Sequence, residues 1–226
     1  MTYSDIRARA RENLRGRWGV SVAAAFVAAI FGALTVSSGN VLQVIENIAE
    51  EAPPRLAATL ALIATGTLGL NLLQLILGGV VQLGYSKFLL SQHDGREYEV
   101  KDLFSQFERF SVGFLQAFLR GLYALLWGLL FLIPGIIKTF SYAMTPFILA
   151  DHPELTASQA IRRSMELMDG HKGELFTLGL TFIGWELLNV LTLGIGSFWL
   201  NPYKNAAYAV FYRDLVTAKR DTYAEY

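Results

Sequence analysis

The chain alternates between long apolar stretches and polar segments that hold most of its Lys and Arg residues, and this alternation constrains the fold more than any other feature. Hydrophobic residues make up 53% of the 226 residues and charged residues 17%, whereas a soluble domain carries about 25% charged residues. Each helical span of a bilayer needs about 20 consecutive apolar residues. The sequence therefore predicts an all-α fold, a polytopic membrane helix bundle that forms a single integral membrane domain over residues 1–226. The expected spans, about six in number, are 18–36, 56–81, 114–133, 136–150, 175–193 and 197–213.

Proline and glycine residues are expected to break the later spans, because proline removes a backbone donor and glycine leaves the backbone free. The stretch 136–150 would rise only about 22 Å as a helix, so it is either a short span or half of a broken helix. The stretch 56–81 is longer than a bilayer needs and is expected to tilt or to run on beyond the membrane. The expected breaks are Pro134, Gly135, Gly194, Gly196 and Pro202.

Three amphipathic helices are expected along the membrane surface, at residues 4–17, 99–111 and 156–169. The first suits an anionic lipid surface, although an ordinary basic flank of the first span has the same composition. The second carries Phe residues on one face, which fits either the headgroup region or packing against the bundle. In the third, Thr156 and Gln159 form a capping-box pattern. The residues expected to contact anionic lipid are Arg7, Arg9, Arg11, Arg15 and Arg17.

The distribution of basic residues sets the expected orientation. With six spans, all Lys and Arg residues outside the spans except Arg55 fall on one side of the membrane. Cytoplasmic segments carry such an excess, so we expect a multi-pass protein of the cell membrane with both termini in the cytoplasm. A five-span alternative would make Pro134 a kink and would expose Arg162, Arg163 and Lys172 on the outside.

Glu186 and Lys204 are the sharpest candidates for a functional site. Each lies nine residues from Ile195 at the centre of the glycine turn, so an antiparallel hairpin brings both to about 13 Å from the turn. A charge that deep in hydrocarbon normally faces the protein interior with a partner. The two residues form either a structural ion pair that holds the last hairpin together or part of an ion or proton relay. The depth match is lost if Pro202 delays the start of the last helix.

A row of small residues on the span 114–133 predicts a close approach of another helix. Arg120 lies about two turns into this span, where its side chain can extend toward the cytoplasmic surface. Asn71 and Gln74 in the span 56–81 are expected to form interhelical hydrogen bonds, with a substrate site as the alternative. The row of small residues is Ala117, Gly121, Ala124 and Gly128.

Short motifs spread over nearly the whole chain carry a family resemblance. They include Arg7…Ala10…Leu14-x-Gly16-x-Trp18, Ile133-Pro134-Gly135-Ile136-Ile137-Lys138, Ser141-Tyr142-Ala143-Met144, Ala160-Ile161-x-x-Ser164 and Leu193-Gly194-Ile195-Gly196. In this order they resemble the bacterial integral membrane family called domain of unknown function 975 (DUF975). The central pattern is also similar to the membrane-anchor part of some bacterial glycerophosphodiester phosphodiesterases. The resemblance implies fold and location, and it supplies no catalytic residues.

The motifs that mark common catalytic and nucleotide sites are absent, including HExxH, GxSxG, the P-loop and the dinucleotide fingerprint. We therefore expect no catalytic residue, no cofactor and no metal ligand. Nucleic-acid binding is not expected either, because membrane orientation explains the N-terminal arginines better. The expected partners are the phospholipid bilayer and either a membrane protein or a second copy of the chain.

Three functions compete. The preferred one is a non-enzymatic membrane protein that engages lipids or membrane proteins through its basic and aromatic cytoplasmic helices. The second is a small transporter or channel that uses Glu186 and Lys204, since broken helices near the middle of a membrane often form transport sites. The third is a membrane-embedded enzyme that acts on lipid, for which a polar cavity with converging carboxylates would be the indication.

Overall fold

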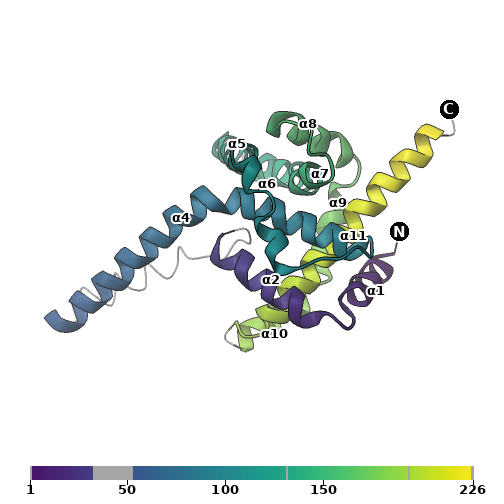
Figure 1. The fold of residues 1–226 in the computed structure, drawn as a ribbon. Coiled ribbons are helices and arrows are strands. Elements are labelled where there is room, and N and C mark those ends of the chain that lie inside the picture. The colour runs from purple at the N-terminus through teal and green to yellow at the C-terminus, as the bar shows by residue number, and fades with distance from the viewer. Residues whose placement is uncertain (1, 33–52, 131, 193, 225–226) are drawn as a thin grey trace.

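The computed structural model describes residues 2–32, 53–130, 132–192 and 194–224, and every regular element in these ranges is a helix (Figure 1). The all-α fold class is confirmed. The elements are α1 (Tyr3–Leu14), α2 (Trp18–Ile30), α4 (Pro54–His93), the 3₁₀ helices η1 (Val100–Phe104) and η2 (Phe107–Arg109), α5 (Phe110–Leu130), α6 (Leu132–Ser141), α7 (Thr145–Asp151), α8 (Ala157–Leu167), α9 (Lys172–Leu180), α10 (Ile183–Leu191) and α11 (Ser197–Ala224).

Four stretches of the described chain are long and apolar enough to cross a membrane. The membrane-capable helices that the sequence predicts are thus present, but the count of six spans is not confirmed. In two of the four stretches, only 11% and 17% of the residues are buried inside the protein, and such apolar surface requires a partner other than water. The stretches are Leu73–His93 in α4, Val100–Leu129 from η1 through α5, Ile133–Asp151 in α6 and α7, and Lys172–Leu191 in α9 and α10.

The first and last expected spans are not among these four. The span 18–36 contains α2, which has only 13 residues, and residues 33–36 lie outside the described ranges. The span 197–213 lies within α11, where Asn201, Lys204 and Asn205 lower the hydropathy. The span 56–81 is longer than expected, because α4 continues through 40 residues to His93. The N-terminal part of α4 projects away from the other helices (Figure 1).

Two expected spans are each divided into a pair of helices. The stretch 136–150 contains the end of α6, a turn and α7. Together these helices form one of the four membrane-capable stretches, Ile133–Asp151, so the choice between a short span and half of a broken helix stays open. The stretch 175–193 is interrupted between α9 and α10, which the sequence did not predict. At the two interruptions, the hydroxyls of Thr145 and Thr181 donate hydrogen bonds of 2.8 and 2.7 Å to carbonyls three residues earlier. These bonds occupy carbonyls at the helix end in place of the next helical turn.

The expected breaks at Pro134 and Gly135 are wrong in position, since α6 begins at Leu132 and includes both residues. A proline in the first turn is tolerated because its missing N–H has no partner in the helix there. Gly135 serves packing, since a Cβ on it would lie 2.8 Å from the Cα of Gly128 on α5.

The glycine turn before α11 forms as expected, but Pro202 does not break the last helix. Gly194 has φ +87°, a left-handed conformation that glycine adopts without strain, and the Gly196 amide donates to the Thr192 hydroxyl over 3.1 Å. Pro202 lies in the second turn of α11, which continues through it. There it removes a single helical hydrogen bond, to the carbonyl of Phe198.

The three amphipathic segments pack against the bundle. On α1, the apolar residues Ile6, Ala10 and Leu14 are buried, and α11 is the main neighbour of this helix. The segment 99–111 forms η1, η2 and the start of α5 in place of one α-helix. In the third segment, the reciprocal hydrogen bonds of a capping box join Thr156 and the N3 residue of α8, which confirms the predicted start of this helix.

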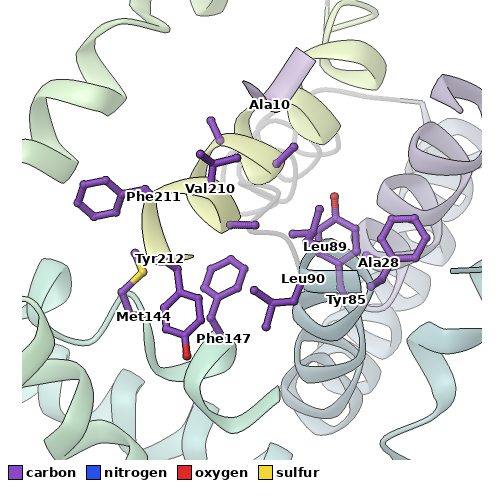
Figure 2. Close-up of a cluster of buried hydrophobic side chains, with 14 of the residues drawn as sticks. Ala10, Ala28, Tyr85, Leu89, Leu90, Met144, Phe147, Val210, Phe211 and Tyr212 are labelled. Carbon is purple, nitrogen blue, oxygen red and sulfur yellow. The ribbon is translucent and has the colours of Figure 1, made fainter. Parts of the chain in front are cut away.

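The core lies where α1, α2, α4, α7 and α11 meet (Figure 2). Phe147 on α7 stacks against Tyr212 on α11 with ring centroids 5.7 Å apart. Ala10 of α1 lies near Val210, which is also on α11 (Figure 2). Small residues on α11 allow α1 to approach it closely. The N-terminal helix is therefore an integral part of the packed core.

Charged residues tie the polar end of this core together. Arg213 on α11 donates from Nε to Asp94 over 3.0 Å and from Nη1 to Asp151 over 2.8 Å. Arg9 on α1 forms a two-pronged ion pair with Asp214, one bond of which measures 2.7 Å. The hydrogen bond with Asp214 raises the pKa of Arg9. α11 is thus fixed to α1, to the end of α4 and to the end of α7.

Candidate functional site

A cavity of about 760 Å³ lies among α4, α5, α6, α7, α9 and α11 and is partly open to the outside. Its apolar wall comes largely from aromatic and leucine side chains, and its described lining contains one charged residue and no carboxylate. The converging carboxylates that would indicate an enzyme are thus not found in that lining. The polar residues of the wall are Gln82, Tyr85, Ser86, Arg120, Thr139, Tyr142, Asn205 and Tyr208.

Arg120 is held in the cavity by two glutamine side chains. Its Nη1 donates to the Oε1 atoms of Gln82 and Gln116, both over 3.2 Å. Gln116 is fully buried and donates in turn to the carbonyl of Gly79 over 3.4 Å. None of the ion pairs among the described residues includes Arg120. The hydrogen-bond partners of the guanidinium among the described residues are therefore neutral.

Tyr85 contributes an unsatisfied polar group to the same cavity. Its side chain is 3% exposed, and its hydroxyl has no hydrogen-bond partner among the described residues. The ring is fixed against Phe88, with centroids 6.1 Å apart. A buried hydroxyl without a partner is costly, by about 1–3 kcal/mol. This cost makes Tyr85 a candidate donor to a bound ligand.

The structure brings Glu186 and Lys204 together as the hairpin geometry predicts. Lys204 Nζ lies 2.5 Å from Glu186 Oε1, and the two side chains are 28% and 41% exposed. Asn205 and Tyr208, which follow Lys204 on α11, line the cavity. Tyr203, the other tyrosine near the pair, donates to the carbonyl of Arg7 over 3.3 Å.

The five N-terminal arginines fall into two groups. Arg7 and Arg9 make contacts within the protein, because Arg7 donates to the carbonyl of Thr181 over 3.0 Å and Arg9 pairs with Asp214. The other three point outward: Arg11 is exposed, Arg15 contacts Glu12 at 3.4 Å, and Arg17 lies over the ring of Tyr98 at 5.0 Å. None of these three guanidinium groups is tied to another helix of the core by an ion pair among the described residues.

The row of small residues on α5 has two roles. Ala117 and Gly128 meet other helices, since a Cβ on Gly79 of α4 would lie 2.8 Å from the Cβ of Ala117 and Gly128 contacts α6. Gly121 and Ala124 line the cavity, and a Cβ on Gly121 would meet nothing within 4 Å. The small side chains beside Arg120 thus leave open space, a signal that sequence analysis assigned to helix packing alone.

Of the two polar α4 residues expected to form interhelical hydrogen bonds, the structure describes the side chain of one. Gln74 donates to the carbonyl of Ile30 on α2 over 3.0 Å, an interhelical hydrogen bond as expected. The side chain of Asn71 lies outside the described residues. Gln82, Tyr85 and Ser86, the α4 residues in the polar wall of the cavity, were not among the predicted site residues. The spacing of three between Gln82 and Tyr85 on one helix, opposite a charged residue on the next span, was the available signal.

The fold defines an all-helical protein with several stretches able to cross a membrane and a cavity built around an arginine. The chain belongs to the family described as protein of unknown function (DUF975), whose profile matches residues 1–141 and 129–219. The expected family resemblance is confirmed. No curated protein matches the chain, and no solved structure does. The likeness to the anchors of glycerophosphodiester phosphodiesterases is therefore not shown.

Proposed function

We propose that this chain is a non-enzymatic, multi-pass protein of the cell membrane, with both termini in the cytoplasm, that engages anionic lipids through the arginines at the junction of α1 and α2. The supporting observation is that α1 buries its apolar face against α11 while Arg11 and Arg15 stay outside; the side chain of Arg15 is 80% exposed. A rigid helix thus presents basic groups at the start of an apolar helix. Each such group contributes about 1 kcal/mol of attraction to an anionic surface.

Aromatic side chains beside α2 support this placement. The segment that follows α4 runs along α2, because Tyr98 meets Arg17 at one end of α2 and Phe104 meets Phe31 at the other, with ring centroids 5.6 Å apart. Phe104 and Phe107 are exposed. Since the 13 residues of α2 rise about 20 Å, these rings lie deeper than the arginines. Their exposed faces suit contact with lipid chains, while Arg17 and Tyr98 share the end of α2 that would meet the headgroups.

Neutralising the outward arginines is expected to weaken the preference for anionic lipid. The double variant Arg11→Gln/Arg15→Gln removes two positive charges, about 2 kcal/mol in total, so the relative affinity for phosphatidylglycerol over phosphatidylcholine should fall at least tenfold. The measurement is quenching of Trp18 by brominated lipids in reconstituted vesicles, in a background where the other three tryptophans are phenylalanine. In the parent background, raising the salt concentration should also reduce the preference.

The matched control is Arg162→Gln/Arg163→Gln on α8, which removes the same charge from exposed positions remote from α2 (Figure 1). We expect it to leave the quenching of Trp18 unchanged. Equal quenching by both lipids in the parent protein, or a preference that does not respond to salt, would refute the proposal.

The transporter alternative is favoured by one arrangement, the ion pair of Glu186 and Lys204 beside the cavity and the break between α9 and α10. It predicts ion or solute flux in proteoliposomes above that of empty vesicles, and Glu186→Gln should abolish this flux because the relay loses its carboxylate. Glu12→Gln makes the same chemical change on the surface of α1 and should leave the flux intact. Unchanged flux in Glu186→Gln would exclude this role for the pair.

A further inference from the structure

We propose that the cavity around Arg120 binds the phosphate of an anionic phospholipid, with the acyl chains leaving along its apolar wall. This site is distinct from the arginines at the junction of α1 and α2, and it does not depend on the function proposed above. It would hold one lipid in a defined place, whereas the surface arginines would attract many lipids weakly.

The first argument is the charge of Arg120. A cation inside a membrane-spanning helix is normally paired with an opposite charge, yet the described residues offer Arg120 only the amide oxygens of Gln82 and Gln116. Both accept from the same atom, Nη1, and no described residue accepts from Nε or Nη2. A planar guanidinium with two free donor positions is suited to bind a phosphate through parallel hydrogen bonds.

The second, independent argument is Tyr85. This residue lines the same cavity from α4 and is only 3% exposed. Its hydroxyl has no hydrogen-bond partner among the described residues. A phosphate oxygen would accept from that hydroxyl and would satisfy it. Arg120 from α5 and Tyr85 from α4 would then hold one anion between two helices.

The third argument concerns the size and the walls of the cavity. A volume of about 760 Å³ lies in the range of about 300–1,000 Å³ that small-molecule sites occupy, and it exceeds what inorganic phosphate fills. Phe140, Phe176 and Leu180 belong to the wall. Phe176 and Leu180 are also exposed on α9, in a stretch able to span a membrane. The opening is thus flanked by apolar surface, which favours an amphiphile that enters from the bilayer.

The test is native mass spectrometry of the full chain released from detergent after incubation with phosphatidylglycerol or phosphatidylcholine of equal chain length. We expect one phosphatidylglycerol per chain and at least tenfold weaker retention in Arg120→Gln, while Arg120→Lys keeps part of the binding. Tyr85→Phe removes one hydrogen bond, worth about 1 kcal/mol, and should weaken retention roughly fivefold. Arg11→Gln/Arg15→Gln should retain the lipid. The cavity proposal and the proposal for the surface arginines can therefore be refuted independently, the first by lipid retention and the second by the quenching of Trp18.

Competition distinguishes the sources of the phosphate. Displacement of the lipid by millimolar inorganic phosphate would show that the site takes the free ion, and would overturn the lipid assignment. Because phosphatidylcholine carries the same phosphate beside a choline cation, equal retention of phosphatidylcholine and phosphatidylglycerol would show no selection for a net anionic headgroup, and would overturn the assignment to an anionic phospholipid. Full retention in Arg120→Gln, with the variant still monodisperse, would remove Arg120 from the site. If Arg120→Gln does not fold, unchanged retention in Tyr85→Phe would refute the proposal on its own.

Discussion

Replacing Gly79 with alanine should lower the stability of the helix bundle, although the change adds a single methyl group. A Cβ at this position would overlap the carbonyl oxygen of Gly113 and would lie 2.8 Å from the Cβ of Ala117. The obstacle is the backbone of α5, which cannot rotate aside as a side chain does. Overpacking of this kind costs about 1–3 kcal/mol, and we expect the upper end of that range because α4 and α5 would have to separate.

The matched control is Gly121→Ala on α5, where the added Cβ would meet nothing within 4 Å. Both substitutions gain helix propensity of about 1 kcal/mol, so their difference isolates the helix contact. The propensity gain offsets part of the overpacking, so we expect the melting temperature in detergent to fall by roughly 4–8 °C for Gly79→Ala and to stay the same or rise for Gly121→Ala. Equal melting temperatures for the two variants would mean that α4 and α5 do not meet at Gly79.

Local signals in the sequence predicted some of the helix ends. The capping box at Thr156, the left-handed glycine at Gly194 and the fold class depend on nearest neighbours and composition, which the sequence displays directly. The break between α9 and α10 was not predictable, because residues 175–193 contain no proline and no run of polar residues. Thr181 occupies this break, with a hydrogen bond from Arg7 that lies 174 positions away in the chain. A long-range contact of this kind leaves no local pattern.

The candidate site was predicted in part for a similar reason. The depth match of Glu186 and Lys204 follows from the rise of a helix, so the pair could be derived from its spacing. The cavity around Arg120 requires three or more segments to leave a space, and the spacing of residues on one helix does not determine what stands opposite it. Ala124 and Gly121 therefore suggested contact, although they border open space.

The N-terminal helix shows the same limit. An amphipathic pattern establishes that Ile6, Ala10 and Leu14 are covered by something apolar, and both lipid and protein meet that condition. The structure covers them with the bundle itself, mainly through α11. The arginines then divide according to which side of α1 they occupy, with Arg9 held by Asp214 and Arg15 free to face the membrane surface.

Reversing the charge of Glu186 should release α10 from the bundle. α10 contains no buried residue, and among the described residues its bond to Lys204 is the one side-chain hydrogen bond that joins it to another helix. The variant Glu186→Lys would place two cations side by side in a stretch able to span a membrane. Because the two side chains are 28% and 41% exposed, losing the pair costs less than the about 3–5 kcal/mol of a fully buried pair, and repulsion between the two cations adds to that loss.

The rescue variant makes this prediction specific. Adding Lys204→Glu to Glu186→Lys restores opposite charges at the same two positions, so we expect the amount of monodisperse protein in size-exclusion chromatography to return close to that of the parent chain. Glu12→Lys provides a control for charge reversal, because the exposed pair of Glu12 and Arg15 contributes less than about 1 kcal/mol. If Glu186→Lys behaves like Glu12→Lys, or if the double variant stays as poorly folded as the single one, then the contact between Glu186 and Lys204 does not hold α10 in place.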